Sequence, residues 1–152
     1  AMLDPSGTEL ILRDYVHIGI AVDTPHGLVV PVLRDADRKG LWQIAADLAD
    51  LSGRARARRL APDEMAGASM TISSLGARGG TGFTPIVNPP EVAILGLARA
   101  DLAPVWTGTA FVPAPMLPLC LSYDHRVIDG AAAAAFLGDH AALISDPRRL
   151  LL

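Results

Sequence analysis

The chain has 152 residues, of which 51% are hydrophobic and 19% are charged. This apolar content excludes a disordered segment, and the single cysteine, Cys120, excludes an internal disulfide and fits a reducing compartment. A formal net charge of −3 provides no basic field for a phosphate backbone, so we expect no nucleic-acid partner. These properties predict one globular domain.

A stretch without charged side chains, residues 102–123, is long enough to cross a membrane as a helix. It contains four prolines and a glycine, and each interior proline disfavours a helix by about 3 kcal/mol. We therefore predict buried strands joined by a turn there, and no membrane partner. Residues 1–12 lack the basic segment of a signal peptide, so secretion is not expected.

The first part of the chain has the pattern of strands. Residues 9–13 and 15–22 are predicted strands, and apolar residues alternate with small or polar ones in the second. The composition of residues 23–27 predicts a turn, after which residues 28–33 form another strand. This arrangement predicts a hairpin.

A helix is predicted next, followed by a short helical turn at 62–64 and a strand over 68–74. Arginines gather at the C-terminal end of that helix, where cations suit the helix dipole. The apolar stripe of the helix consists of Leu41, Ile44, Ala45, Leu48 and Leu51.

Four glycines make residues 76–90 a predicted long loop, which compact domains usually keep for function. Strands are predicted over 92–98 and 117–123, with a hairpin over 105–112 between them. Asp129 is a predicted N-cap for a last helix. That helix would carry Phe136, Leu137, Ala141 and Ile144 on one side. Trp42 and Trp106 are expected to be packing residues.

The densest polar cluster is Asp-His-Arg-Val-Ile-Asp-Gly at residues 124–130, between a predicted buried strand and a helix start. A histidine held by both elements has the rigidity that general base catalysis needs, and imidazole can accept a proton near neutral pH. The alternative is a structural turn, in which His125 is only hydrogen-bonded and Asp124, Arg126 and Asp129 form a solvated ion-pair cluster. Spacing alone leaves both interpretations open.

This heptapeptide, preceded by Leu-Ser-Tyr, resembles the active-site signature of the dihydrolipoamide acyltransferases, the core components of 2-oxoacid dehydrogenase complexes. Further segments resemble that family in the same order. They are the opening HIGIAVDTPHGLVVPVLRDAD, the run SMTISSLG with the following GGT, and NPPEVAI. The resemblance implies an α+β fold like that of chloramphenicol acetyltransferase, a two-layer sandwich of a mixed sheet with helices packed on it.

The resemblance also implies the chemistry. His125 would be the general base that removes the thiol proton of coenzyme A, so that the thiolate attacks a thioester carbonyl. Ser73 would donate a hydrogen bond to the resulting oxyanion, with Ser74 beside it near the coenzyme. Asp129 would support the active-site turn, through a hydrogen bond or an ion pair that could involve Arg126.

Two further positions are implied to bind coenzyme A: Asp23, otherwise a turn residue, and Ala98, otherwise a core residue. No metal site is expected, because His17, His26 and His140 lack clustered ligands. Cys120 is expected to be a buried thiol.

The resemblance runs from residue 9 to residue 152. Residues 1–8 are therefore expected to be a tag scar or linker remnant, and residues 9–152 the C-terminal part of a catalytic domain whose N-terminal segment is missing. No lipoyl domain is expected in this chain, so the lipoate would be carried on a separate domain.

The implied assembly is a homotrimer whose active site lies between two subunits, with trimers building a core of 24 or 60 chains. The implied partners are a lipoyl domain and the decarboxylase and dihydrolipoamide dehydrogenase components of the complex. Residues 147–152 form an apolar tip that we expect to contact another trimer. The implied location is the cytoplasm, or the mitochondrial matrix in a eukaryote.

The main hypothesis is acyl transfer between dihydrolipoamide and coenzyme A, of the pyruvate or branched-chain type. A free-standing coenzyme A-dependent acetyltransferase is the alternative within the same class. A non-catalytic structural core fragment is the alternative from another class, because the N-terminal segment that normally helps to hold the coenzyme is missing.

Overall fold

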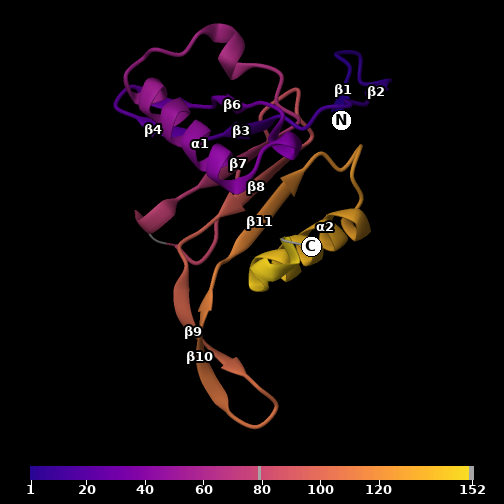
Figure 1. Cartoon of the computed structure of the whole chain (residues 1–152). Helices are drawn as coiled ribbons and strands as arrows, with labels where there is room; N and C mark the ends of the chain where they lie inside the picture. The colour runs from indigo at the N-terminus through magenta and orange to yellow at the C-terminus, as the bar shows by residue number, and fades with distance from the viewer. Residues whose placement is uncertain (79, 151–152) are drawn as a thin grey trace.

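The computed structural model describes residues 1–78 and 80–150, and shows a mixed sheet with two long helices (Figure 1). The strands are β1 (Met2–Leu3), β2 (Leu10–Ile11), β3 (Ile18–Ile20), β4 (Val22–Thr24), β5 (Gly27–Val29), β6 (Val32–Leu33), β7 (Met70–Ser74), β8 (Ala93–Leu97), β9 (Asp101–Trp106), β10 (Phe111–Met116) and β11 (Leu119–Tyr123). The helices are α1 (Leu41–Arg56) and α2 (Gly130–Ser145), with short 3-10 turns η1 (Ala36–Arg38), η2 (Pro62–Met65), η3 (Gly76–Arg78) and η4 (Pro147–Leu150).

Five strands form the central sheet in the order β11-β8-β7-β3-β6. The inner pairs β8–β7 and β7–β3 are parallel, whereas the outer pairs β11–β8 and β3–β6 are antiparallel. Helix α1 packs on β4 and β6, and α2 packs on β11 near the other edge of the sheet (Figure 1). The predicted α+β class and mixed sheet are confirmed. No helix within the described residues is both long and apolar enough to span a membrane.

Most predicted elements are found where the sequence placed them. The hairpin around residues 23–27 is the antiparallel pair β4–β5, and the predicted strand over residues 92–98 is β8. The long predicted strands 15–22 and 28–33 are each interrupted, so that β3 and β6 belong to the central sheet while β4 and β5 form a separate ribbon. Pro31 explains one interruption, because its backbone has no N–H to donate to a ladder.

Residues 1–8 include the first strand of a short hairpin at the start of the chain. Strand β1 pairs antiparallel with β2, and the carboxylate of Asp4 accepts hydrogen bonds from the backbone N–H groups of Ser6, Thr8 and Glu9. These residues thus have an ordered local structure, and the expectation that they are a tag scar or linker remnant stays a prediction. The apolar tip proposed at residues 147–152 falls partly outside the described residues, which end at Leu150.

The prediction of buried strands over residues 102–123 is only partly right. Strands β9 and β10 pair with each other and form an arm that projects from the body of the molecule (Figure 1). Leu102 and Phe111 are both 70% exposed, so this arm is not core. Trp106 packs on Phe111 with ring centroids 5.1 Å apart. Trp42, also expected to pack, is 85% exposed at the start of α1.

The helix faces are also only partly as predicted. In α1, Leu51 and Ala55 are buried, whereas Leu41 is 75% exposed. In α2 the buried residue is Ala133, and Ile144 of the predicted stripe is 48% exposed. Periodicity therefore predicted both helices correctly. The most buried residues lie toward the C-terminal end of α1 and toward the N-terminal end of α2, away from the centre of each predicted stripe.

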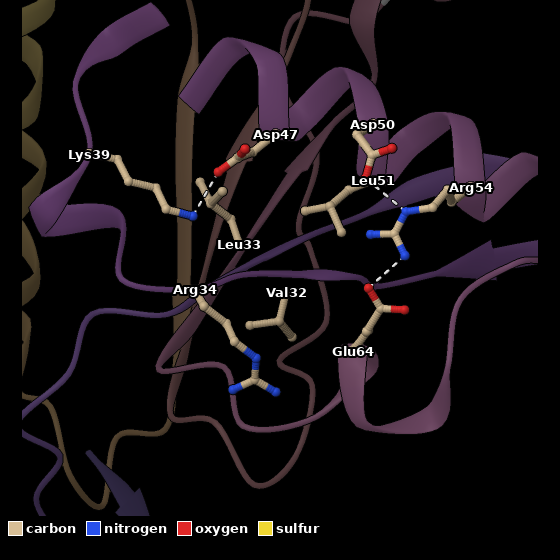
Figure 2. Close-up of a pocket in the computed structure, with 9 residues that line it drawn as sticks. All are labelled: Val32, Leu33, Arg34, Lys39, Asp47, Asp50, Leu51, Arg54 and Glu64. Carbon is tan, nitrogen blue, oxygen red and sulfur yellow. Dashed lines mark hydrogen bonds and ion pairs between the residues drawn. The ribbon is translucent and has the colours of Figure 1, made fainter. Parts of the chain in front are cut away.

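Ion pairs join α1 to the residues before it and to the segment after it (Figure 2). The Arg54 guanidinium donates to Asp50 on the same helix at 2.7 Å and to Glu64 of η2 at 2.6 Å. Lys39, before the helix, binds Asp47 at 2.7 Å. These pairs line a small hollow of about 220 Å³, and most of the charged groups in its wall are paired with each other.

A buried polar contact links the strands at the middle of the sheet. Thr71 of β7 is 1% exposed, and its hydroxyl donates to the carboxylate of buried Glu91 at 2.7 Å. Asn88 donates to the other carboxylate oxygen at 3.3 Å. Burial raises the pKa of Glu91 above its ordinary value, and these two hydrogen bonds oppose the rise.

Close packing beside Thr71 requires a glycine in β3. A Cβ at Gly19 would lie 2.5 Å from Oγ1 of Thr71 and 3.0 Å from Cγ1 of Val30. We predict that Gly19→Ala lowers the free energy of unfolding by about 1 to 3 kcal/mol, the typical cost of overpacking. Gly53→Ala on α1 is the control, because a Cβ there would meet no atom within 4 Å beyond its chain neighbours and the backbone of its own helix. Denaturant unfolding of both variants measures this, and equal stabilities would contradict it.

Glu91 also predicts a pH dependence of stability. Because its pKa is raised in the folded state, the folded chain binds the proton more tightly than the unfolded chain does. Its contribution to stability is thus complete below the ordinary value of 4.5 and is lost as the pH rises through the raised pKa. Between about pH 4 and about pH 8, Glu91→Gln should lose less stability than the unsubstituted chain. Parallel pH profiles of the two unfolding midpoints would contradict this role.

Candidate active site

His125 lies on a tight turn between β11 and α2. The backbone N–H of Asp124 donates to the carbonyl of Val92 at 2.8 Å, which joins the turn to the segment before β8. The N–H groups of Val127 and Ile128 both donate to the carbonyl of Asp124, at 2.9 and 3.0 Å. The backbone on both sides of His125 is therefore fixed, as the sequence predicted for a histidine between a strand and a helix.

The two neighbours of His125 form an ion pair with each other. The Arg126 guanidinium donates to both carboxylate oxygens of Asp124, with a shortest distance of 2.6 Å. These bonds, together with the Arg126 backbone N–H, lower the pKa of Asp124 to about 2. Asp124 thus stays charged across the neutral range. Its carboxylate also accepts the backbone N–H of Arg126 at 3.0 Å, which stabilises the turn.

The side chain of His125 is exposed, and its ring packs on Tyr123 with centroids 5.5 Å apart and a tilt of 41°. Among the described residues, the imidazole forms no hydrogen bond. Both ring nitrogens are thus open to a group that comes from outside this chain.

Asp129 is the N-cap of α2, as predicted. Its carboxylate accepts the backbone N–H of Ala132 at 2.8 Å. The ion pair considered between Asp129 and Arg126 is not formed, because Arg126 is bound to Asp124. Asp129 therefore acts on the turn by fixing where the helix begins.

Three other predicted site residues meet in one hollow of about 830 Å³. Asp23 of β4 lines it from one side, and Ser73 and Ser74 line it from the end of β7. The Ser74 hydroxyl accepts the backbone N–H of Gly76 at 3.1 Å, which fixes the turn after the strand. Ser73 is half-buried. The structure thus brings together residues that are 50 positions apart in the sequence.

His125 does not reach this hollow, because the sheet places it at the opposite end. Ser73 is level with Gly96 of β8, whereas Tyr123 is level with Ala93, and the chain continues away from Ser73 toward His125. At about 3.3 Å per residue, the three steps of register from Gly96 to Ala93 span about 10 Å along the strands. Within one chain, Ser73 and His125 therefore lie toward opposite ends of the strands, and Ser73 lines the hollow whereas His125 does not.

Two other residues singled out by the sequence, Ala98 and Cys120, lie outside the hollow. Ala98 is 2% exposed and donates its N–H to the carbonyl of Pro118, so it supports the end of β8 without lining the hollow. Cys120, expected to be a buried thiol, is half-buried in β11.

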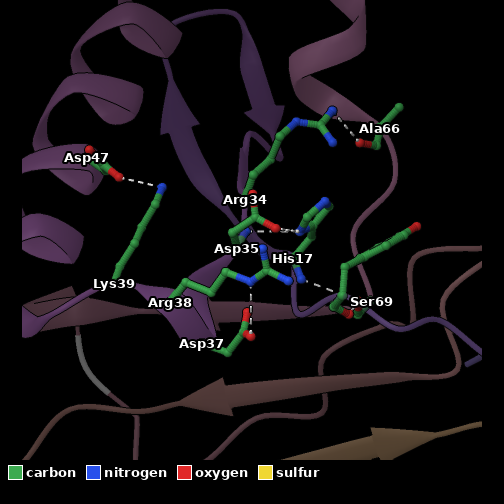
Figure 3. A network of polar contacts seen from close by, with 10 residues as sticks. His17, Arg34, Asp35, Asp37, Arg38, Lys39, Asp47, Ala66 and Ser69 are labelled. Carbon is green, nitrogen blue, oxygen red and sulfur yellow. Dashed lines mark hydrogen bonds and ion pairs between the residues drawn. The ribbon is translucent and has the colours of Figure 1, made fainter.

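His17 is packed into the fold (Figure 3). Its Nδ1 accepts the N–H of Asp35 at 3.0 Å, and its ring stacks on Tyr15 with centroids 4.0 Å apart. Nδ1 is therefore occupied by a hydrogen bond within the fold. Within the part of the chain that the structure describes, no three His, Cys, Asp or Glu side chains group as metal ligands.

Sequence reasoning missed the wall that α1 gives to the hollow. Leu48, Ser52 and Arg56 line it together with the β4 and β7 residues. Leu48 belongs to the predicted apolar stripe, but Ser52 and Arg56 continue the same helix face and were not part of that prediction. A face that mixes an apolar, a hydroxyl and a cationic side chain has no hydrophobic periodicity to detect.

The fold and these residues define a class. The family model of the 2-oxoacid dehydrogenases acyltransferase (catalytic domain) matches residues 1–152, and the chain belongs to this family.

Individual relatives are closely similar. The dihydrolipoyllysine-residue acetyltransferase component of the pyruvate dehydrogenase complex from Pseudomonas aeruginosa is 63% identical over 150 residues, which are 99% of this chain and 27% of that protein. A structure from a crystallographic and enzymatic investigation of the Azotobacter vinelandii dihydrolipoamide acetyltransferase is 60% identical, with a TM-score of 0.95 over 99% of this chain and 62% of the other. That investigation concerns the role of a serine, a histidine and an asparagine in the catalytic mechanism. The cubic core of the pyruvate dehydrogenase multienzyme complex matches with the same identity, TM-score and coverage.

The capping role of Asp129 is testable by two substitutions. Asp129→Ala removes the acceptor for the Ala132 N–H and should lower the free energy of unfolding by about 1 kcal/mol. Asp129→Asn keeps an acceptor oxygen and should be nearly neutral. Denaturant unfolding of the two variants separates them, and an equal loss in both would show that the charge, rather than the cap, matters.

Proposed function

We propose that this chain supplies the catalytic histidine and the oxyanion-binding serine of a dihydrolipoyl acetyltransferase. Ser73 precedes His125 by 52 positions and Asp129 follows it by four. The serine, histidine and asparagine of the Azotobacter vinelandii enzyme have the same two spacings. This agreement, within a match of 60% identity and a TM-score of 0.95, is the observation that carries the proposal.

In the proposed reaction, His125 takes the proton from the thiol of coenzyme A. The thiolate sulfur then attacks the carbonyl carbon of acetyl-dihydrolipoamide and forms a tetrahedral oxyanion, to which the Ser73 hydroxyl donates. The oxyanion collapses and the carbon–sulfur bond to dihydrolipoamide breaks. The protonated imidazole returns its proton to the leaving sulfur, so that acetyl-coenzyme A and dihydrolipoamide are released and the histidine is regenerated.

The site forms between two copies of the chain. Ser73 and His125 lie at opposite ends of one sheet, and the exposed His125 ring faces outward. A second copy that brings its His125 to the hollow of Asp23 and Ser73 completes the catalytic set. A cyclic trimer does this for every copy, because each interface then repeats the same contact.

The proposed acyl group is acetyl. Two similar relatives, at 63% and 60% identity, are acetyltransferase components of pyruvate dehydrogenase complexes. The similarity to a cubic core supports assembly of trimers into a shell of 24 chains. The proposed partners are the lipoyl domain that delivers the acyl group and the decarboxylase and dihydrolipoamide dehydrogenase components of the complex.

Separate substitutions at the two residues test the chemistry in the full-length protein. His125→Ala removes the base and should lower the acetyl-transfer rate by about 10² to 10⁴. Ser73→Ala removes one oxyanion donor and should lower it by about 10² to 10³. Unchanged transfer from acetyl-coenzyme A to dihydrolipoamide in His125→Ala would reject the proposed mechanism.

Mixing the two inactive variants tests the shared site. If equal amounts are unfolded and reassembled together, about a quarter of the interfaces pair an intact His125 with an intact Ser73, because each interface takes one residue from each copy. About a quarter of the activity should therefore return. No recovery in oligomers shown by native mass spectrometry to be mixed would contradict a site between copies.

A further inference from the structure

The α1 wall of the Ser73 hollow has an ordered chemical character. Leu48, Ser52 and Arg56 recur every fourth residue and form one stripe along the helix. At 1.5 Å per residue, the stripe extends about 12 Å from an apolar to a cationic side chain. Leu48 and Ser52 are half-buried and Arg56 is exposed. The cation thus stands at the rim of the hollow.

The Arg56 side chain at this rim has no ion-pair partner among the described residues. Arg54 is bound to Asp50 and Glu64, whereas Arg56 forms no ion pair or hydrogen bond with any described residue through its side chain. Arg58 and Arg59 follow, and both are exposed. Arg58 has a left-handed backbone with φ of 56°, just after the end of the helix. A local excess of positive charge therefore lies beside the hollow in a chain whose net charge is −3.

The helix dipole alone explains arginines at the end of α1, but it does not explain why one of them lines the hollow. Only Arg56 of the three exposed arginines does so. A guanidinium at the rim of a pocket with hydroxyl groups deeper inside fits an elongated ligand with an anionic end, since guanidinium groups bind phosphate by two parallel hydrogen bonds.

We propose that Arg56 binds a phosphate group of coenzyme A, with Ser52 as a neighbouring hydroxyl donor. This inference rests on the proposed function. The thiol end lies toward Ser73, the apolar and amide arm passes Leu48, and the phosphates lie at the rim.

The test compares Arg56→Ala with the matched control Arg59→Ala in the full-length protein. Both remove an exposed arginine near the end of α1, but only Arg56 lines the hollow. Binding of coenzyme A is measured by calorimetry, and acetyl transfer to dihydrolipoamide is measured with acetyl-coenzyme A and with S-acetylpantetheine, which has no phosphate. Dephospho-coenzyme A shows whether the 3′-phosphate or the diphosphate is bound.

Arg56→Ala should weaken coenzyme A binding and raise its KM by about 10- to 100-fold, the usual effect of losing a hydrogen bond to a charged group. The rate with S-acetylpantetheine should stay unchanged, and Arg56→Lys should recover part of the loss. Arg59→Ala should change neither substrate by more than about twofold.

Three results would overturn the assignment. They are an unchanged KM in Arg56→Ala, an equal loss with S-acetylpantetheine, and an equal loss in Arg59→Ala. The first result would show that Arg56 does not contact the coenzyme. The second would show that Arg56 has a structural role. The third would show that the positive charge near the end of α1 acts as a whole, without a specific contact from Arg56. If the unsubstituted protein itself neither binds coenzyme A nor transfers acetyl groups, the proposed function fails instead, and the two failures are thereby distinguished.

Discussion

The pairing of three strands, β7, β8 and β11, determines what one copy of this chain can do. Strands β7 and β8 are parallel, and β11 is antiparallel to β8. The C-terminal ends of β7 and β11 therefore lie at opposite ends of the strands in the sheet. Ser73 lies near the first of these ends, and His125 follows the second. Each residue of register along the strands separates the two positions by a further distance of about 3.3 Å, the rise of a strand residue. The proposed site between two copies is therefore compatible with the sheet topology.

The same topology explains why the turn at His125 is rigid without contacts to the imidazole. The backbone of the turn is tied to the segment before β8 through Asp124, and the following helix begins where Asp129 caps it. Arg126, the other charged neighbour, is bound to Asp124. All three polar side chains next to the histidine are thus used to hold the backbone, which leaves the ring positioned and free to meet a second copy.

Local patterns in the sequence predicted the helices, the hairpins and the cap, because each depends on neighbouring residues. Motif resemblance identified Ser73 and Asp23, and the structure brings them into one hollow. The exposure of Trp42 and Phe111 was not predictable, because apolar composition does not tell whether a surface faces its own core or another chain. The lining role of Arg56 was missed for a related reason: it depends on which helix face packs against β4.

The arm formed by β9 and β10 exposes apolar side chains but limits strand pairing along its edges. Pro104 and Pro113 lie directly opposite each other, and a proline is accommodated in a ladder only where its nitrogen faces outward. Both outer edges of the arm therefore lack a donor at the same level, and strand addition along either edge is disfavoured. Trp106 and Phe111 pack on each other and leave their outer surfaces exposed. The arm can consequently pack against another surface through its side chains while its edges resist uncontrolled β-pairing.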